Sequence, residues 1–252
     1  MTQKQIFIFF LIIIPTLVIV YAGNNEETLN NEQTNFKSYY YPFESFKTSK
    51  VYHFLPDNKN NSELFWVLSF KKENNKTYLL TDSYAKDSLG NLSHIEVIKE
   101  EINNEGAFVK EYLEIQHDNN GQTFNSPAVM ESEGVFLWNL NKNDEIIWKF
   151  KTENKIDPRY VIETSRKRKF IGKSLSIEFV NKKVPTIEFK DNFKISYIRK
   201  LNKQRDDFDF TQTSYYAKGI GLYKYTRVFK ESQITYTLSD VISHAEFKKM
   251  KN

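Results

Sequence analysis

The sequence has 252 residues and contains no cysteine, only eight glycines and only six prolines. Without cysteine the chain has no disulfide, no thiolate nucleophile and no thiolate ligand for a metal. The absence also excludes a bacterial lipid anchor, whose chemistry needs a cysteine directly after the cleaved leader, where Gly23 and Asn24 stand. The fold must therefore be held by burial and hydrogen bonding, which a domain of this length can supply.

A strong charge of one sign is also lacking. The chain has 36 Lys and Arg and 32 Asp and Glu, and residues 1–22 contain one of the lysines, so the rest carries 35 basic and 32 acidic side chains. Nucleic-acid binding requires a concentrated basic surface that neutralises phosphates. Nucleic acid is therefore not a predicted partner.

A long hydrophobic run, residues 6–20, follows Lys4 and ends just before Ala22. A basic start, an apolar stretch and a small-residue site predict a cleavable signal peptide over residues 1–22. The alternative is an uncleaved membrane anchor, which needs about 20 apolar residues, whereas Pro15 interrupts this run. We expect export to the periplasm, the cell surface or the medium, with membrane contact only through the leader before cleavage.

After the leader the sequence divides into a polar segment and one β-rich domain. Residues 23–38 are poor in apolar side chains, so they cannot recover the entropy cost of ordering and are expected to be flexible. Residues 39–252 show the alternation of apolar and polar side chains that is typical of strands, with Asn, Asp and Gly at the turns. The predicted strands are 51–55, 64–70, 77–80, 95–98, 108–116, 134–137, 146–150, 160–164, 174–180, 186–189, 193–199, 211–217, 221–229 and 233–238.

The predicted fold class is all-β and mainly antiparallel, because parallel strands need long crossovers that the sequence does not provide. Residues 239–251 predict a short C-terminal helix from which Phe247 would point away. Its inward residues would be Val241, Ile242, Ala245 and Met250. An outer-membrane barrel is the alternative for an exported chain of alternating strands. The basic last residues and the strands that are charged on both faces argue against it.

No cluster of residues predicts a metal, a cofactor or a catalytic centre. The four histidines have no metal-ligand spacing, and single solvated or hydrogen-bonded side chains are expected. Asp206, Asp207 and Asp209 lack the glycine and the later glutamate of a calcium loop, so a solvated loop is expected. A nucleophilic serine motif of the G-x-S-x-G type is absent. The histidines are His53, His94, His117 and His244.

Two short motifs suggest binding but have structural alternatives. Gly219 and Gly221 resemble part of a phosphate-binding loop, but Lys224 stands where the third glycine belongs. Paired glycines among strands more often mark a bulge, or a close approach of backbone to a covering side chain. The basic run 166–169 predicts an exposed hairpin or a contact with an anionic surface.

Aromatic residues are abundant, with 15 Tyr, 21 Phe and 3 Trp. Rings fit the half-buried surface of a sheet, so core packing explains most of them. Some tyrosines and tryptophans are also candidates for lining a groove that takes a lipid or a sugar. These candidates are Trp138, Trp148, Tyr215 and Tyr216.

Two stretches resemble a known family. Residues 41–43 (Tyr-Pro-Phe) followed by 51–54 (Val-Tyr-His-Phe) resemble the opening "Y-P-L … W-x-Y" of exported β-rich domains of unknown function from Bacteroidota, of the DUF3108 and TapB-like type. Residues 216–222, with Leu238 after them, are similar to the closing "A-x-G-V-G-L-V … L". The glycine usual before the first aromatic strand is missing from residues 45–49. The resemblance implies a curled open sheet or half-barrel, like periplasmic lipoprotein carriers, with an apolar concave face and no catalytic residues.

These observations predict an exported, non-enzymatic envelope or secreted protein that binds an apolar or extended, lipid-like ligand in a concave β face. A structural or adhesive surface protein that acts through another envelope protein is the alternative. A hydrolase is the third possibility, and it would need two carboxylates from separate strands that converge in one cleft.

Overall fold

The computed structural model describes residues 35–118, 120–142 and 144–250. The predicted signal peptide and most of the predicted flexible leader lie outside these residues. The last part of that leader is folded, because Asn35 forms a β-bridge with Asn139 and the side chain of Phe36 is buried. The ordered structure therefore begins before Tyr39, the predicted start. None of the helices among the described residues has the length and hydrophobicity needed to cross a membrane.

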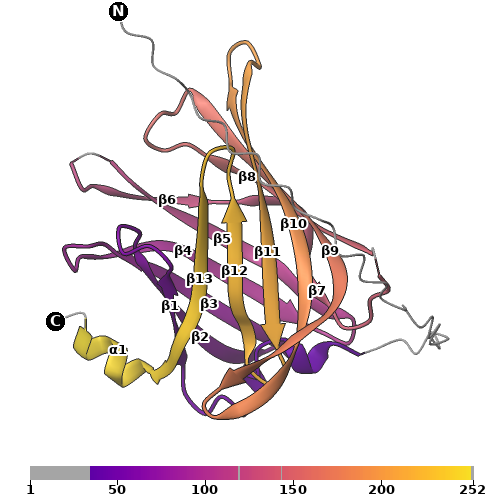
Figure 1. Cartoon of the computed structure of the whole chain (residues 1–252). Helices are drawn as coiled ribbons and strands as arrows, with labels where there is room; N and C mark the ends of the chain where they lie inside the picture. Colours follow the sequence, from indigo (N-terminus) through magenta and orange to yellow (C-terminus); the bar gives the residue numbers. More distant parts are fainter. Residues whose placement is uncertain (1–34, 119, 143, 251–252) are drawn as a thin grey trace, which may run out of the picture. The chain divides into compact units, whose positions relative to one another are not determined.

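Thirteen strands, two short 3₁₀ helices and one α-helix make up the described residues (Figure 1). The elements are η1 Lys37–Tyr39, η2 Phe43–Ser45, β1 Lys50–Pro56, β2 Glu63–Glu73, β3 Lys76–Lys86, β4 Leu92–Ile102, β5 Gly106–His117, β6 Thr123–Pro127, β7 Val129–Leu137, β8 Glu145–Glu153, β9 Tyr160–Phe179, β10 Lys182–Arg199, β11 Arg205–Ala217, β12 Gly221–Val228, β13 Gln233–Ser243 and α1 His244–Met250.

The strands form a closed antiparallel barrel, so the expected open sheet or half-barrel is wrong. The strand order is β4-β3-β2-β1-β13-β12-β11-β10-β9-β8-β7-β5, and β4 also pairs with β5, which completes a ring of twelve strands. Strand β6 adds to the C-terminal part of β5, where β7 has left it. Closure satisfies the hydrogen-bonding groups that an open sheet would expose at its two edges.

The predicted strands coincide with most of the observed ones, but two pairs merge. The stretches 160–164 and 174–180 are both parts of β9, and 186–189 and 193–199 are both parts of β10. The basic run 166–169, expected to be an exposed hairpin, instead lies in the middle of β9 and pairs with both β8 and β10. Strand β6 was not predicted, because its sequence Thr-Phe-Asn-Ser-Pro lacks the apolar alternation of a strand.

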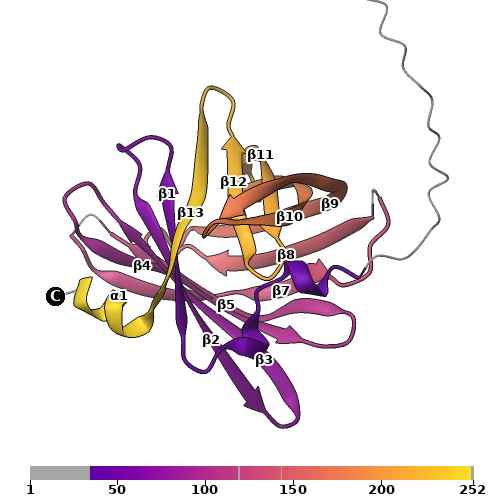
Figure 2. The ribbon, with the colours of Figure 1, turned by 60° about the horizontal axis from the view of Figure 1, so that its bottom comes forward.

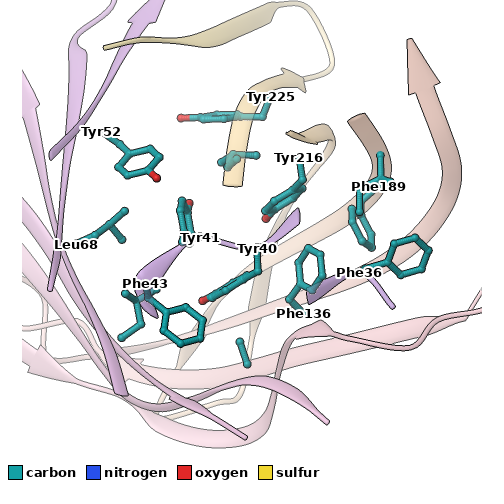
Figure 3. Packing of buried hydrophobic residues seen from close by; sticks show 14 of the residues in the cluster. Phe36, Tyr40, Tyr41, Phe43, Tyr52, Leu68, Phe136, Phe189, Tyr216 and Tyr225 are labelled. Atoms are coloured by element: carbon teal, nitrogen blue, oxygen red, sulfur yellow. The ribbon is translucent and has the colours of Figure 1, made fainter. Parts of the chain in front are cut away.

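Residues 36–46 close one end of the barrel from inside. Eight strands leave an interior just wide enough for side chains to fill, so a ring of twelve needs additional material at its centre. Phe36 packs on Phe170, and Tyr40 packs edge-on against Phe136. Figure 2 brings this end of the barrel forward, and Figure 3 shows Tyr40, Tyr41 and Phe43 among the rings of the surrounding strands. We call residues 36–46 the plug.

Hydrogen bonds tie the plug to the barrel at several points. The Tyr40 hydroxyl donates to Glu100 on β4, and the backbone N–H of Gly219 donates to the carbonyl of Ser38. Tyr41 lies edge-on to Tyr52 and directly against Gly221. The plug is thus an integral part of the core.

The predicted C-terminal helix is confirmed, but it is shorter and faces a different way. Residues up to Ser243 continue β13, and Ser243 caps α1 reciprocally with Glu246, as in a capping box. Phe247, expected to point away, is the buried residue and packs on Phe65 of β2, on the face of the sheet opposite to the barrel interior. Met250, expected inward, is 58% exposed.

Candidate functional site

The half of the barrel beyond the plug contains a partly open cavity of about 350 Å³, the lower end of the usual range for small-molecule sites. Nine strands and Tyr41 of the plug contribute to its walls. Its apolar lining residues are Trp66, Ile98, Trp148, Phe150, Ile162, Phe193, Ile195, Phe210 and Leu222. Its ionisable acidic and basic residues are Glu96, Glu100, Glu114, Arg166, Arg168 and Arg227. The lining is therefore amphipathic, which differs from the apolar face that the family resemblance implied.

A buried ion pair lies between the plug and the cavity. Arg168 donates from Nε to Asp191 Oδ1 at 2.6 Å and from Nη2 to Asp191 Oδ2 at 3.0 Å. The two residues are 1% and 0% exposed. Burial alone would raise the pKa of Asp191, but the Arg168 guanidinium outweighs burial and holds that pKa below its usual range. A bidentate geometry of this kind is needed to recover the desolvation cost of two buried charges.

Side chains of four neighbouring strands extend this pair into one hydrogen-bond network. Arg168 also donates to the Tyr216 hydroxyl at 2.9 Å, and Ser214 donates to Asp191 at 3.0 Å. Gln212 donates to the Ser214 hydroxyl and accepts from Arg227 Nε, both at 2.9 Å. The network holds several lining side chains in fixed positions, which is what a preformed binding site requires.

Each of the three carboxylates in the lining accepts hydrogen bonds from neighbouring side chains. Glu96 accepts from Tyr112 and Ser83, and Glu100 accepts from Tyr40. Burial raises the pKa of both Glu96 and Glu100, and these hydrogen bonds offset the rise only in part.

Glu114 is the third carboxylate of the lining, and it lies opposite Glu96 in the β4–β5 ladder. It accepts hydrogen bonds from the side chains of Gln116 and Thr152. Two carboxylates from separate strands therefore line one cavity as direct cross-strand neighbours, which is the kind of arrangement that the hydrolase alternative required.

Arg166 is the least well paired of the basic residues in the cavity. It is 7% exposed and lies 5.2 Å from the centre of the Trp148 ring. Its Nη2 atom makes long contacts of 3.4 and 3.3 Å with the carbonyls of Gly134 and Val135. Burial and the neighbouring charge of Arg168 lower the pKa of Arg166 to about 10.

The histidines do not assemble into a site. His53 contacts Glu63, His117 contacts the carbonyl of His94, and His94 stacks on Tyr84. His244 starts α1. Within the part of the chain that the structure describes, no three His, Cys, Asp or Glu side chains are grouped as metal ligands would be.

The acidic residues 206–209 are not a loop but the exposed start of β11, where Asp207 pairs with Lys194. Gly219 and Gly221 lie at the β11–β12 turn, and the close approach of Gly221 to a covering side chain, that of Tyr41, is confirmed. Neither motif contributes a side chain to the cavity.

The four aromatic candidates separate into three groups. Trp148 and Tyr216 line the cavity. Trp138 is a core residue whose indole N–H donates to the carbonyl of Asn103. Tyr215, next to the inward Tyr216, lies on the outer face of β11.

Sequence reasoning missed the charged lining residues. In β9 the run 166–169 alternates, so that Arg166 and Arg168 are buried while Lys167 is exposed. The period of two was visible, but charged side chains are rarely buried unless paired, and the partner Asp191 lies on another strand. No local sequence pattern distinguishes a strand with buried, paired charges from a strand whose charged side chains face solvent.

Comparison with solved structures shows a shared fold. The chain is similar to a protein described as a "putative lipoprotein" from Parabacteroides distasonis, with a TM-score of 0.53 and 14% identity over 81% of this chain and 98% of that one. It also matches a "putative exported protein with YmcC-like fold" from Bacteroides fragilis, with a TM-score of 0.48 and 10% identity over 78% and 97% of the two chains. No protein-family model and no curated protein matches the sequence.

Proposed function

We propose that this chain is an exported, non-enzymatic protein that holds a small amphipathic molecule inside its barrel. The observation that carries the proposal is the partly open cavity of about 350 Å³, in which apolar and aromatic walls surround a few fixed polar groups. Pockets of that composition are the usual sites for small ligands, because apolar walls provide affinity and polar groups set orientation. A barrel whose interior is completely filled by side chains would instead favour the structural or adhesive alternative.

Two further observations support the destination outside the cytoplasm. The apolar run before Ala22 has the composition of a signal peptide. The Parabacteroides distasonis protein of similar fold is a "putative lipoprotein", which agrees with an envelope location. We also propose that the chain is related to the exported DUF3108 and TapB-like domains that its first and last strands resemble.

Extraction of the protein purified from its native host with organic solvent, followed by mass spectrometry, tests the proposal. We expect one co-purifying amphipathic compound in the wild type. Thr164→Phe should lose it, because Thr164 lines the cavity. Thr213→Phe is the matched control, since Thr213 alternates with the buried Gln212 and Ser214 and faces outward. Repeated absence of a compound from the wild type, or equal loading of both variants, would contradict the proposal.

A hydrolase is the second candidate, and the facing pair Glu96 and Glu114 favours it. Cross-strand neighbours have Cβ atoms about 4.5–5.5 Å apart, and retaining glycosidases use carboxyl groups about 5 Å apart. We nevertheless expect no turnover of a panel of nitrophenyl glycosides, because side chains of the protein already bind both carboxylates. Turnover by the wild type that Glu96→Gln abolishes would establish the hydrolase instead.

A further inference from the structure

Two N–H groups of the cavity lining have no hydrogen-bond acceptor among the described residues. Arg166 Nε and Trp148 Nε1 are buried, and neither has a hydrogen-bond partner among the described residues. The nearest carboxylate oxygen recorded for Arg166 Nε is Asp191 Oδ1 at 3.9 Å, and that oxygen already accepts from Arg168 at 2.6 Å. A buried donor without an acceptor costs about 1–3 kcal/mol, and more when it is charged.

The two donors belong to side chains that touch each other. The Arg166 guanidinium lies over the Trp148 ring at 5.2 Å, and both residues line the same cavity. Arg166 comes from β9 and Trp148 from β8, where the two residues are direct partners in the ladder. The two unpartnered donors therefore belong to directly paired positions of neighbouring strands.

The carboxylates of the lining differ from these two donors, because each has a hydrogen-bond partner in the protein. Glu96, Glu100 and Glu114 each accept at least one hydrogen bond from a protein side chain. Burial raises the pKa of Glu96 and Glu100, and the hydrogen bonds from Tyr112, Ser83 and Tyr40 lower it. The two buried polar atoms of the lining that have no partner among the described residues are thus both donors.

The walls beside these donors are flat and aromatic. Trp148 packs on Phe150 at a ring separation of 4.9 Å, and Tyr112 packs on Phe150 at 4.4 Å. Phe193 and Phe210, from β10 and β11, are stacked with an interplanar angle of 5° and line the same cavity. Aromatic walls of this kind favour a planar apolar body through stacking and edge contacts.

We propose that the cavity selects a planar organic acid, whose oxyanion accepts hydrogen bonds from Arg166 Nε and Trp148 Nε1 while its apolar body lies among the aromatic walls. The inference rests on the proposed function, because it names the chemical class of the molecule held in the barrel. An oxyanion at this place gives Arg166 the counter-charge that the protein itself supplies only at 3.9 Å.

Two fluorescent probes that differ by one acidic group test this inference. Anilinonaphthalene sulfonate carries a sulfonate on the same rings that phenylnaphthylamine has without one. A hydrogen bond to a charged group contributes about 1.5–3 kcal/mol, so we expect the wild type to bind the sulfonate roughly tenfold to hundredfold more tightly. Fluorescence titration of the full chain with each probe gives the two dissociation constants.

Three variants test which side chains cause the preference for the sulfonate probe. Arg166→Met should abolish it, so that the dissociation constants of the two probes lie within about threefold of each other. Lys167→Met is the matched control, because it removes the same charge from the adjacent, outward position of β9 and should retain the preference. Trp148→Phe keeps a ring and removes only the N–H, so it should reduce the preference even if Arg166→Met fails to fold.

The outcomes separate this inference from the proposed function. Equal binding of both probes by the wild type, with Thr164→Phe blocking both, would overturn the acid selectivity and leave the proposed function standing. A sulfonate preference that survives both Arg166→Met and Trp148→Phe would also overturn the selectivity. Failure of the wild type to bind either probe would overturn both proposals.

Discussion

Replacing Asp191 by alanine is expected to lower the free energy of unfolding by about 3–5 kcal/mol, because it leaves the buried Arg168 guanidinium without its counter-charge. Most domains of this kind have only about 5–15 kcal/mol in total, so the loss is a large fraction of the stability. The variant also removes the acceptor of the Ser214 hydroxyl. Urea unfolding followed by tryptophan fluorescence measures the change.

A surface pair with the same geometry is the control. Asp157 accepts from Arg159 Nε at 2.8 Å and from Nη2 at 2.6 Å, but Arg159 is 69% exposed. Exposed ion pairs contribute about 0–1 kcal/mol, so Asp157→Ala should cost little. The double variant Arg168→Met, Asp191→Leu should recover part of the loss, because no unpaired charge remains buried. Equal costs for the two aspartates would contradict the assigned role of the buried pair.

Acid should remove the contribution of Asp191 to the free energy of unfolding. Its pKa in the folded protein lies below the ordinary value of about 3.9, so its stabilising effect is fully present above that ordinary value. The effect is lost as the pH falls through the folded pKa, when the carboxylate must be protonated in both states. We therefore expect the difference between the wild type and Asp191→Ala to be constant near neutrality and to shrink in acid. A difference that does not depend on pH down to about 2 would argue against an ionised Asp191.

The local strand pattern was predictable because alternation and turn chemistry are local. Asn74 and Asn75 adopt positive φ values of 48° and 62° between β2 and β3, as expected for an Asn-Asn hairpin turn. The close contact at Gly221 was also anticipated, since a glycine within a strand often marks a backbone that something approaches. In both cases the residues on which the prediction rested, Asn74 with Asn75 and Gly219 with Gly221, lie next to each other or two apart in the sequence.

Closure of the barrel and the charged interior were not predictable in the same way. Neighbouring strands of the ring mostly follow one another in the sequence, and the ring closes only because the first strand, β1, pairs with the last, β13. This pairing places Lys50 opposite Ser243, near the two ends of the described residues. Such long-range pairing leaves no mark in the local alternation of either strand.

The site itself was missed because its residues look like surface residues one at a time. Arg166 and Arg168 sit in a run of basic side chains that suggests solvent, and Glu96 and Glu114 sit in strands rich in charge. Their burial depends on partners contributed by other strands, such as Asp191 and Tyr112. Only the aromatic candidates Trp148 and Tyr216 were identified, because a large ring among strands is expected to be buried wherever it points inward.

Gly221→Ala is expected to cost about 2–5 kcal/mol, because two penalties combine at one position. The backbone φ of Gly221 is +101°, where side chains other than glycine are strained by about 1–2 kcal/mol. A β-carbon there would lie 2.4 Å from Cδ1 of the Tyr41 ring, and overpacking a core typically costs about 1–3 kcal/mol more. The ring cannot easily yield, since Tyr41 is 8% exposed and packs on Tyr52.

Gly219→Ala separates the two penalties, because Gly219 also has a positive φ, +73°, but open space where its β-carbon would lie. It should cost about 1–2 kcal/mol from the backbone alone, and the excess for Gly221→Ala then measures the contact with the plug. Tyr41→Leu combined with Gly221→Ala should be less destabilising than the sum of the single changes, since the leucine removes the ring that the new methyl group meets. Equal costs for the two glycines, or strict additivity in the double variant, would mean that Tyr41 does not occupy the end of the barrel and that the plug is not part of the folded core.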